Sequence, residues 1–96
     1  MLVVVTYDVN ISQTAGAKRL RKVAKLCERF GIRVQNSVFE VLVDAAQLVV
    51  LKNQLEAAID PELDSIRFYR LGNSYQQKIE VMGKARRVET GAPLLL

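Results

Sequence analysis

Residues 2–8 read Leu-Val-Val-Val-Thr-Tyr-Asp, and this stretch decides the fold because it predicts a buried strand. Its β-branched and apolar side chains fall on both alternating faces, which is typical of a strand covered on both sides. A carboxylate at the exit of such a strand is costly unless it meets a cation, a metal ion or a hydrogen-bond donor. Asp8 is therefore a candidate metal ligand; the alternative is that it only caps the turn at residues 9–11.

The next element along the chain is a helix, expected from Ser12 or Thr14 to Gly31. Apolar residues recur along it at helical spacing, and most of its basic side chains fall on the opposite side. Arg19 is the exception, because it falls on the flank of the apolar stripe near Phe30. A charge in that place needs a carboxylate or a phosphate as its partner.

The rest of the chain completes an α+β pattern. Residues 32–43 predict a long strand with a bulge or bend at the polar residues 36–37. Asp44 is a suitable N-cap for a second helix, and residues 65–71 predict another strand. A short extra strand is expected over residues 78–82.

This order predicts a βαββαβ sandwich of the α+β class over residues 1–83, followed by a basic, mobile tail over residues 84–96. Two helices cover only one face of the sheet, yet the strands are apolar on both faces. A second copy of the chain, packed sheet to sheet, would cover the other face, so we expect a homodimer. Near a two-fold axis Asp8 would face its counterpart, and such a pair of carboxylates can hold a divalent ion.

Composition narrows the functional classes. The 96 residues, half of them hydrophobic, suffice for one domain with a modest core. We expect no signal peptide and no membrane partner, since no apolar run approaches the roughly 20 residues of a membrane span. The single cysteine, Cys27, excludes an internal disulfide and a zinc site of paired cysteines. A cytoplasmic protein fits these features best.

Positive charge is clustered along the chain, although the net charge is only +4. Residues 18–33 hold seven basic side chains against one acid, Glu28. A second basic cluster consists of Lys84, Arg86 and Arg87. Clusters of this kind are typical of proteins that bind the phosphate backbone of nucleic acids. The alternative for the helix is a solvated face without a ligand.

Four segments together resemble a known family. They are Tyr7-Asp8-Val9, residues 18–25 (Lys-Arg-Leu-Arg-Lys-Val-Ala-Lys), residues 33–40 (Arg-Val-Gln-Asn-Ser-Val-Phe-Glu) and residues 64–71 (Asp-Ser-Ile-Arg-Phe-Tyr-Arg-Leu). On these segments the chain resembles the small CRISPR-associated Cas-two proteins, the dimeric partners of the Cas-one integrase in spacer acquisition. The resemblance implies a ferredoxin-like fold, a homodimer formed through the sheets, and a C-terminal strand that is often lent to the partner chain.

The resemblance also implies an activity and its residues. The family's best-known acidic residue matches Asp8, and the two Asp8 side chains of a dimer would bind Mg²⁺ or Mn²⁺. Their reaction would be phosphodiester hydrolysis of single-stranded RNA or double-stranded DNA. The positions that match the family's substrate-binding residues are Tyr7, Arg19, Arg21, Arg33 and Phe39. From charge alone we add Lys25, Lys84, Arg86 and Arg87 as nucleic-acid-binding residues.

Two functions stay open at this point. One is a metal-dependent endonuclease; because the chain has no histidine, its base must be metal-bound water or a carboxylate. The other is a non-catalytic DNA-binding scaffold that bridges Cas-one integrase dimers, with Asp8 in a structural role. Phe39 and Tyr7 have an alternative as core or dimer-interface residues. Ser37 could aid metal or phosphate contact, or only form a local backbone hydrogen bond.

Overall fold

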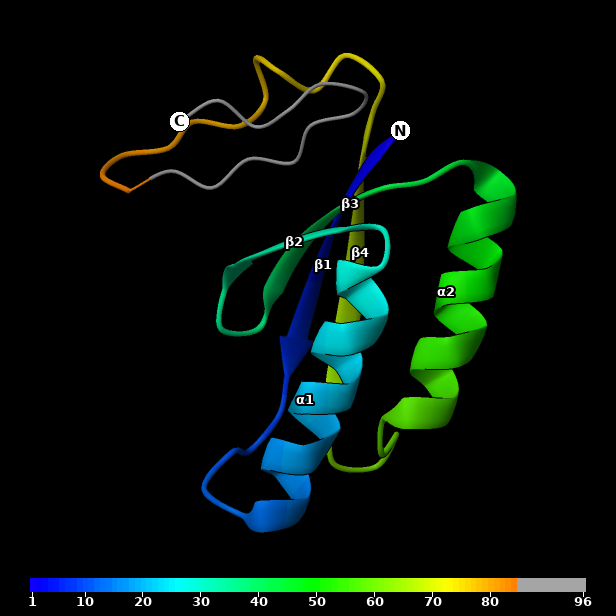
Figure 1. Ribbon diagram of the computed structural model, residues 1–96, viewed down its shortest axis with the longest axis vertical. Helices are drawn as coiled ribbons and strands as arrows, with labels where there is room; N and C mark the ends of the chain where they lie inside the picture. Colours follow the sequence, from blue (N-terminus) through cyan, green and yellow to red (C-terminus); the bar gives the residue numbers. More distant parts are fainter. Residues whose placement is uncertain (85–96) are drawn as a thin grey trace.

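The computed structural model describes residues 1–84, which form one antiparallel sheet with two helices on one of its faces (Figure 1). The strands are β1 (Leu2–Asp8), β2 (Gly31–Gln35), β3 (Val38–Leu42) and β4 (Ser65–Gly72), and the helices are α1 (Thr14–Glu28) and α2 (Ala45–Ala58). Their order along the chain confirms the predicted βαββαβ sandwich. Across the sheet the order is β2-β3-β1-β4, so β1 is a central strand.

The apolar β1 forms as expected, but its two faces differ. Val3, Val5 and Tyr7 are buried under the helices, with 0%, 0% and 2% of their surface exposed. Val4 and Thr6 point to the other side of the sheet, where they are only half-buried. The face without helices is called the open face below. The described chain by itself therefore covers one side of β1 well and leaves the other side incompletely covered.

The stretch 32–43 forms two strands instead of one. β2 and β3 pair antiparallel with Gln35 opposite Val38, so residues 36–37 make the turn of a hairpin. The predicted single strand with a bulge was wrong because the two polar residues reverse the chain completely. The irregularity in the pairing lies just before the turn, between Arg33 and Gln35.

The two helices begin differently. Gln13 occupies the cap position of α1 and its side chain makes no cap hydrogen bond. Ser12, one of the two expected caps, instead donates its backbone N–H to Asn10 Oδ1 at 3.0 Å. Asp44 caps α2 as predicted: Gln47 N–H donates to Asp44 Oδ1 at 2.7 Å, and Asp44 N–H donates to Gln47 Oε1 at 2.9 Å. This reciprocal pair is a capping box.

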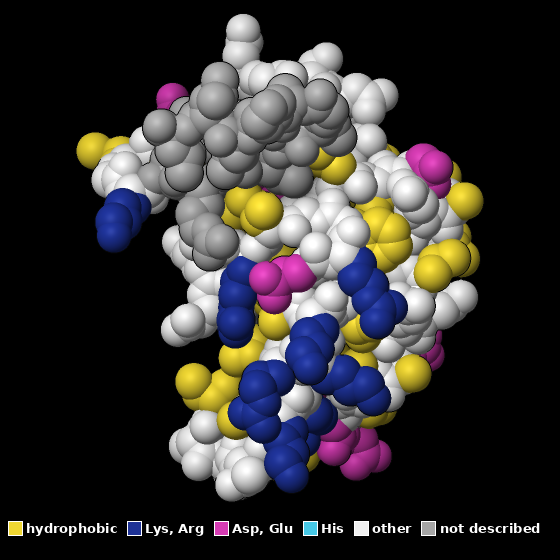
Figure 2. Space-filling model, in the orientation of Figure 1, with side chains coloured by type: hydrophobic (Ala, Val, Ile, Leu, Met, Phe, Trp, Pro, Cys, Tyr) yellow, Lys and Arg dark blue, Asp and Glu magenta, His cyan; other side chains and the backbone are white. Residues whose placement is uncertain are grey.

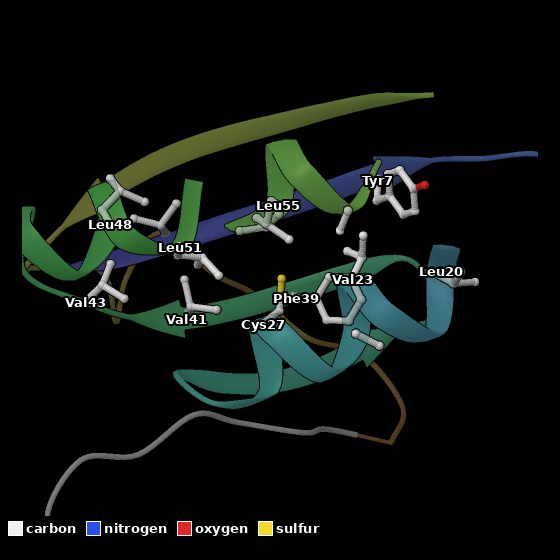
Figure 3. Packing of buried hydrophobic residues seen from close by; sticks show 14 residues of the cluster. Tyr7, Leu20, Val23, Cys27, Phe39, Val41, Val43, Leu48, Leu51 and Leu55 are labelled. Carbon is white, nitrogen blue, oxygen red and sulfur yellow. The ribbon is translucent and has the colours of Figure 1, made fainter. Parts of the chain in front are cut away.

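The core lies between the sheet and the helices. Figure 3 shows Val23 and Cys27 from α1 beside Phe39 of β3, and Leu51 and Leu55 from α2 in the same buried cluster. Their exposed fractions are all 1% or less. Cys27 is therefore a core residue, and burial, with a smaller contribution from Glu28, raises the pKa of its thiol to about 12.

Residues 73–84, which follow β4, do not join the sheet. The short strand expected over residues 78–82 is absent from the described part of the chain. Lys78 instead donates from Nζ to the backbone oxygen of Leu71 at 2.9 Å. The predictions made for residues 85–96 lie outside the described residues. Between residues 1 and 84, neither helix has the length and apolar character needed to cross a membrane.

Candidate metal and nucleic-acid site

Asp8 ends the central strand, so it lies between the first residue of β4 and the β2–β3 turn. It pairs with Ser65 across β1 and β4. On the other side, the backbone N–H of Tyr7 donates to the backbone oxygen of Ser37 at 2.9 Å. Asp8 itself is exposed. A hollow of about 350 Å³ opens at this end of the sheet, lined by Thr6, Tyr7, Asp8, Ser37, Ser65, Arg67 and Tyr69.

The carboxylate of Asp8 has no protein partner among residues 1–84: no described hydrogen bond or ion pair engages it. The turn that follows it is closed by Asn10, whose side chain accepts from Ser12. This arrangement does not support the alternative in which Asp8 only caps that turn. A charged group that ends a buried strand and lacks a partner is free to bind a cation.

The residues beside Asp8 carry oxygen atoms, which are the donors that a hard divalent cation prefers. Mg²⁺ prefers oxygen ligands, and the hollow offers the Asp8 carboxylate with Ser37 and Ser65 next to it. Residues 1–84 of one chain contain no group of three acidic, histidine or cysteine side chains that could hold a metal. Among the described residues, one chain therefore supplies one carboxylate, that of Asp8, to the hollow.

Arg67 and Tyr69 line the hollow and were not among the predicted site residues. Arg67 Nη1 donates to Tyr69 Oη at 3.4 Å, and this contact raises the pKa of the Arg67 guanidinium. They share the face of Asp8 because Thr6 pairs with Arg67 and Val4 with Tyr69. The alternation of β4 was visible in the sequence, but its register against β1 was not. Arg67 is the basic residue that lines the hollow.

Behind the hollow, Tyr7 and Arg19 both bind Asp64. The Tyr7 hydroxyl donates to Asp64 Oδ2. Arg19 donates from Nε to Oδ2 at 2.7 Å and from Nη2 to Oδ1 at 3.0 Å. The backbone N–H of Asp60 also donates to Oδ2, at 3.0 Å. The predicted need of Arg19 for a carboxylate is thus met, and we call Tyr7, Arg19 and Asp64 the triad.

The triad holds a buried charge. The Asp64 side chain is 0% exposed, whereas the Arg19 side chain is 20% exposed. Burial alone would raise the pKa of Asp64, but hydrogen bonds from Arg19, Tyr7 and the backbone of Asp60 lower it to about 2. Burial and the bond to Asp64 raise the pKa of Tyr7 to about 12. The carboxylate is therefore ionised and the phenol neutral over the whole physiological range.

Two predicted nucleic-acid-binding residues are buried in the described chain. Tyr7 is 2% exposed and Phe39 is 0% exposed, so neither ring is available at the surface of the described chain. Both are core residues, which was their alternative interpretation. Arg33 is half-buried, donates from Nε to the backbone oxygen of Asn36 at 2.7 Å, and lies 5.8 Å from the centre of the Phe39 ring.

The other predicted basic residues lie on the surface. Figure 2 shows Lys and Arg side chains gathered over α1. The exposed residues of this surface, which we call the basic face of α1, are Lys18, Arg21, Lys22 and Lys25, with Arg29 just after the helix. Lys84 is exposed too, and Arg86 and Arg87 lie outside the described residues. Arg21 and Lys25 are thus accessible to a nucleic acid, as their predicted role requires.

Comparisons with known proteins agree with this fold. A family model described as CRISPR associated protein Cas2 matches residues 1–79. A protein of Halalkalibacterium halodurans named CRISPR-associated endonuclease Cas2 is 54% identical, over 99% of each chain. A protein of Rhodospirillum rubrum named CRISPR-associated endoribonuclease Cas2 3 is 52% identical, over 99% of this chain and 100% of the relative.

A solved structure is similar as well. The crystal structure of Streptococcus pyogenes Cas2 at pH 6.5 superposes with a TM-score of 0.82 at 55% sequence identity. The match covers 86% of this chain and 100% of that chain. Sequence and structure therefore point to the same family across nearly all the described residues.

Proposed function

This chain belongs to the CRISPR-associated Cas2 family, and on that premise we propose that it is a metal-dependent endonuclease of spacer acquisition. Its substrate class is RNA or double-stranded DNA, whose phosphodiester bonds it hydrolyses. The observation that carries the proposal is the exposed Asp8 carboxylate, which ends the central strand in a hollow and has no partner among the described residues. The names of the two relatives, an endonuclease and an endoribonuclease, support the reaction class.

The active unit that we propose is a homodimer formed through the open faces of two sheets. Val4, Thr6 and Asp8 lie on this face by the alternation of β1. Glu40, opposite Val4, lies there too, and burial raises the pKa of its carboxyl group. A second sheet would cover the half-buried apolar residues and bring the two Asp8 side chains toward each other across the two-fold axis.

In this dimer each side chain has a distinct task. The Asp8 pair would hold Mg²⁺ or Mn²⁺, with Ser37 and Ser65 as neighbouring oxygen donors. The metal, when bound, supplies a Lewis acid that polarises the phosphoryl group and acidifies water. Arg67, on the same face, is placed to bind a phosphate oxygen and so orient the scissile bond. The basic face of α1 binds the flanking phosphates without reading sequence.

The test is a cleavage assay on RNA and duplex DNA with Mg²⁺, with Mn²⁺ and with a chelator. Asp8→Asn keeps the size of the side chain but removes its charge, so we expect cleavage to fall by at least about 100-fold. Glu56→Gln is the matched control, because it removes one exposed acid from α2, away from the hollow. Equal cleavage by the wild type and Asp8→Asn would contradict the proposal.

A second candidate function rests on the basic face of α1. As a scaffold, the dimer would bind a DNA duplex along this face and bridge two Cas-one integrase dimers, without cleaving anything. Duplex binding by the wild type, with no cleavage in any metal, would favour this function. Spacer integration that persists in Asp8→Asn would show that the scaffold role does not need the carboxylate.

A further inference from the structure

Two members of the triad, Tyr7 and Asp64, directly precede the two residues of the last pair between β1 and β4. Asp8 and Ser65 form that pair between β1 and β4. Tyr7 directly precedes Asp8, and Asp64 directly precedes Ser65. The hydrogen bond from the Tyr7 hydroxyl to Asp64 therefore ties the two strands together beside Asp8.

We propose that Asp64 is a positioning residue for Asp8, and that Tyr7 and Arg19 act on the reaction through Asp64 and not by contact with nucleic acid. This inference deepens the proposed nuclease function and rests on it. Asp64 itself is buried and touches no substrate, so its effect passes through the backbone of the Asp8–Ser65 pair.

Three elements converge on the Asp64 carboxylate. Arg19 comes from α1, Tyr7 from β1, and Asp60 from the turn that precedes β4. The Asp64 backbone N–H also donates to the Asp60 oxygen at 2.8 Å, which fixes that turn. A carboxylate with this many donors holds α1 and the beginning of β4 in fixed positions relative to Asp8.

Arg19 cannot bind Asp64 and the phosphate of a nucleic acid equally well. Two of its guanidinium nitrogens already bind Asp64 in a forked pair. If Arg19 turned away to bind a phosphate, a fully buried carboxylate would lose its cation, which is strongly unfavourable. The geometry thus favours a permanent structural pair over a phosphate clamp.

The experiment measures steady-state cleavage of RNA with Mn²⁺ for the wild type, Asp64→Asn, Arg19→Gln and the double variant. A displacement of Asp8 by about 1 Å is enough to lower kcat by about 10- to 100-fold, which is the loss that we expect for each single variant. The KM for RNA should stay within about twofold, since no phosphate contact is removed. The double variant should lose little more than either single variant, because both changes break the same interaction.

Two further variants complete the design. Glu62→Gln is the matched control, since it neutralises an exposed acid only two residues from Asp64. Tyr7→Phe removes one hydroxyl and leaves the buried ring, so it tests the same contact if Asp64→Asn does not fold. We expect it to lower kcat by about tenfold, again with an unchanged KM.

Two kinetic results would overturn the inference. One is a kcat for Asp64→Asn or Tyr7→Phe that stays within twofold of Glu62→Gln. The other is a raised KM for Arg19→Gln with normal kcat, which would show that Arg19 contacts the substrate.

If the wild type cleaves no nucleic acid, the nuclease proposal fails. The positioning role of Asp64 is then decided by a second measurement. Amide hydrogen exchange then tests the positioning directly. Faster exchange at residues 7–9 in Asp64→Asn or Tyr7→Phe than in Glu62→Gln supports it, and equal exchange in the folded variants overturns it.

Discussion

Asp8 and Asp64 lie at the same end of the sheet in opposite environments. Asp64 is buried, and three groups donate to its carboxylate. Asp8 is exposed, and no described group donates to it. A buried carboxylate depends on its donors, because losing one leaves a buried charge uncompensated, whereas an exposed carboxylate without donors remains available for binding. The residue type is the same, and its surroundings decide the role.

Because the pKa of Asp64 is low, the stability of the folded protein should depend on pH in the acid range. Its folded pKa is about 2 and its ordinary value is 3.8, so the ionised form stabilises the folded state above about pH 4. This contribution is lost as the pH falls from 4 toward 2. In urea unfolding, the difference in the free energy of unfolding between the wild type and Asp64→Asn should therefore shrink as the pH falls across that interval. If this difference in the free energy of unfolding stays constant from pH 5 to pH 2, the low pKa assigned to Asp64 is wrong.

The two helices present different surfaces to solvent. α1 carries the basic face, while α2 has two charged residues, Lys52 and Glu56, and exposes Val49 and Val50 by 58% and 49%. Long-range attraction for a polyanion is therefore concentrated over α1. An encounter with a nucleic acid should take place on that helix whether or not cleavage follows.

Removing charge from α1 should weaken binding in a salt-dependent way. We expect Arg21→Gln and Lys25→Gln each to reduce duplex-DNA affinity and to lower the slope of log K against log salt by about 0.9 per lost phosphate contact. Fluorescence anisotropy over a salt series measures both quantities. Lys52→Gln is the control, because Lys52 lies on α2, 5.1 Å from the centre of the Phe68 ring. A slope that falls equally in all three variants would show that α1 has no special role.

Much of the fold followed from local patterns. β1, the Asp44 cap and β4 were predicted because strand alternation and capping chemistry are carried by neighbouring residues. The hairpin of β2 and β3 was missed since its turn, residues 36–37, contains no glycine. Alternating apolar residues continue on both sides of that turn, so the pattern resembled one interrupted strand.

The site was predictable only in part. The end of β1 singled out Asp8, and helical spacing showed that Arg19 needs a partner. That partner, Asp64, is 45 residues away, so only the folded topology identifies it. The place of Arg67 beside Asp8 depends on strand register, and the burial of Tyr7 depends on which face the helices cover. None of these is a local property of the sequence.

At the scale of the whole molecule, the two helices of residues 1–84 form a layer on one face of the sheet, and no described element forms a layer on the other. The helices cover one face of the sheet, and the open face holds Val4 and Thr6 half-buried and Tyr69 45% exposed. A sheet with apolar residues on both faces is normally covered on both sides. The proposed second copy supplies this layer and the second Asp8 together.

A charge on the open face should separate the dimer without unfolding the chain. Val4→Lys places an ammonium group in the middle of the proposed interface, where burial would be costly. We expect a monomer in sedimentation velocity, with a native circular dichroism spectrum and no metal-dependent cleavage. Val49→Lys makes the same substitution on the exposed surface of α2 and should remain dimeric and active. A dimeric Val4→Lys would place the interface elsewhere.

The buried thiol has a practical consequence for labelling. Cys27 has no exposed surface, and its thiol stays protonated far above neutral pH, so it will not react with maleimides in the folded protein. A single cysteine introduced at an exposed position, as in Glu62→Cys, would then be the only reactive thiol of the described residues. Spin labels attached there would report the separation between two copies in solution, with Cys27 left in place.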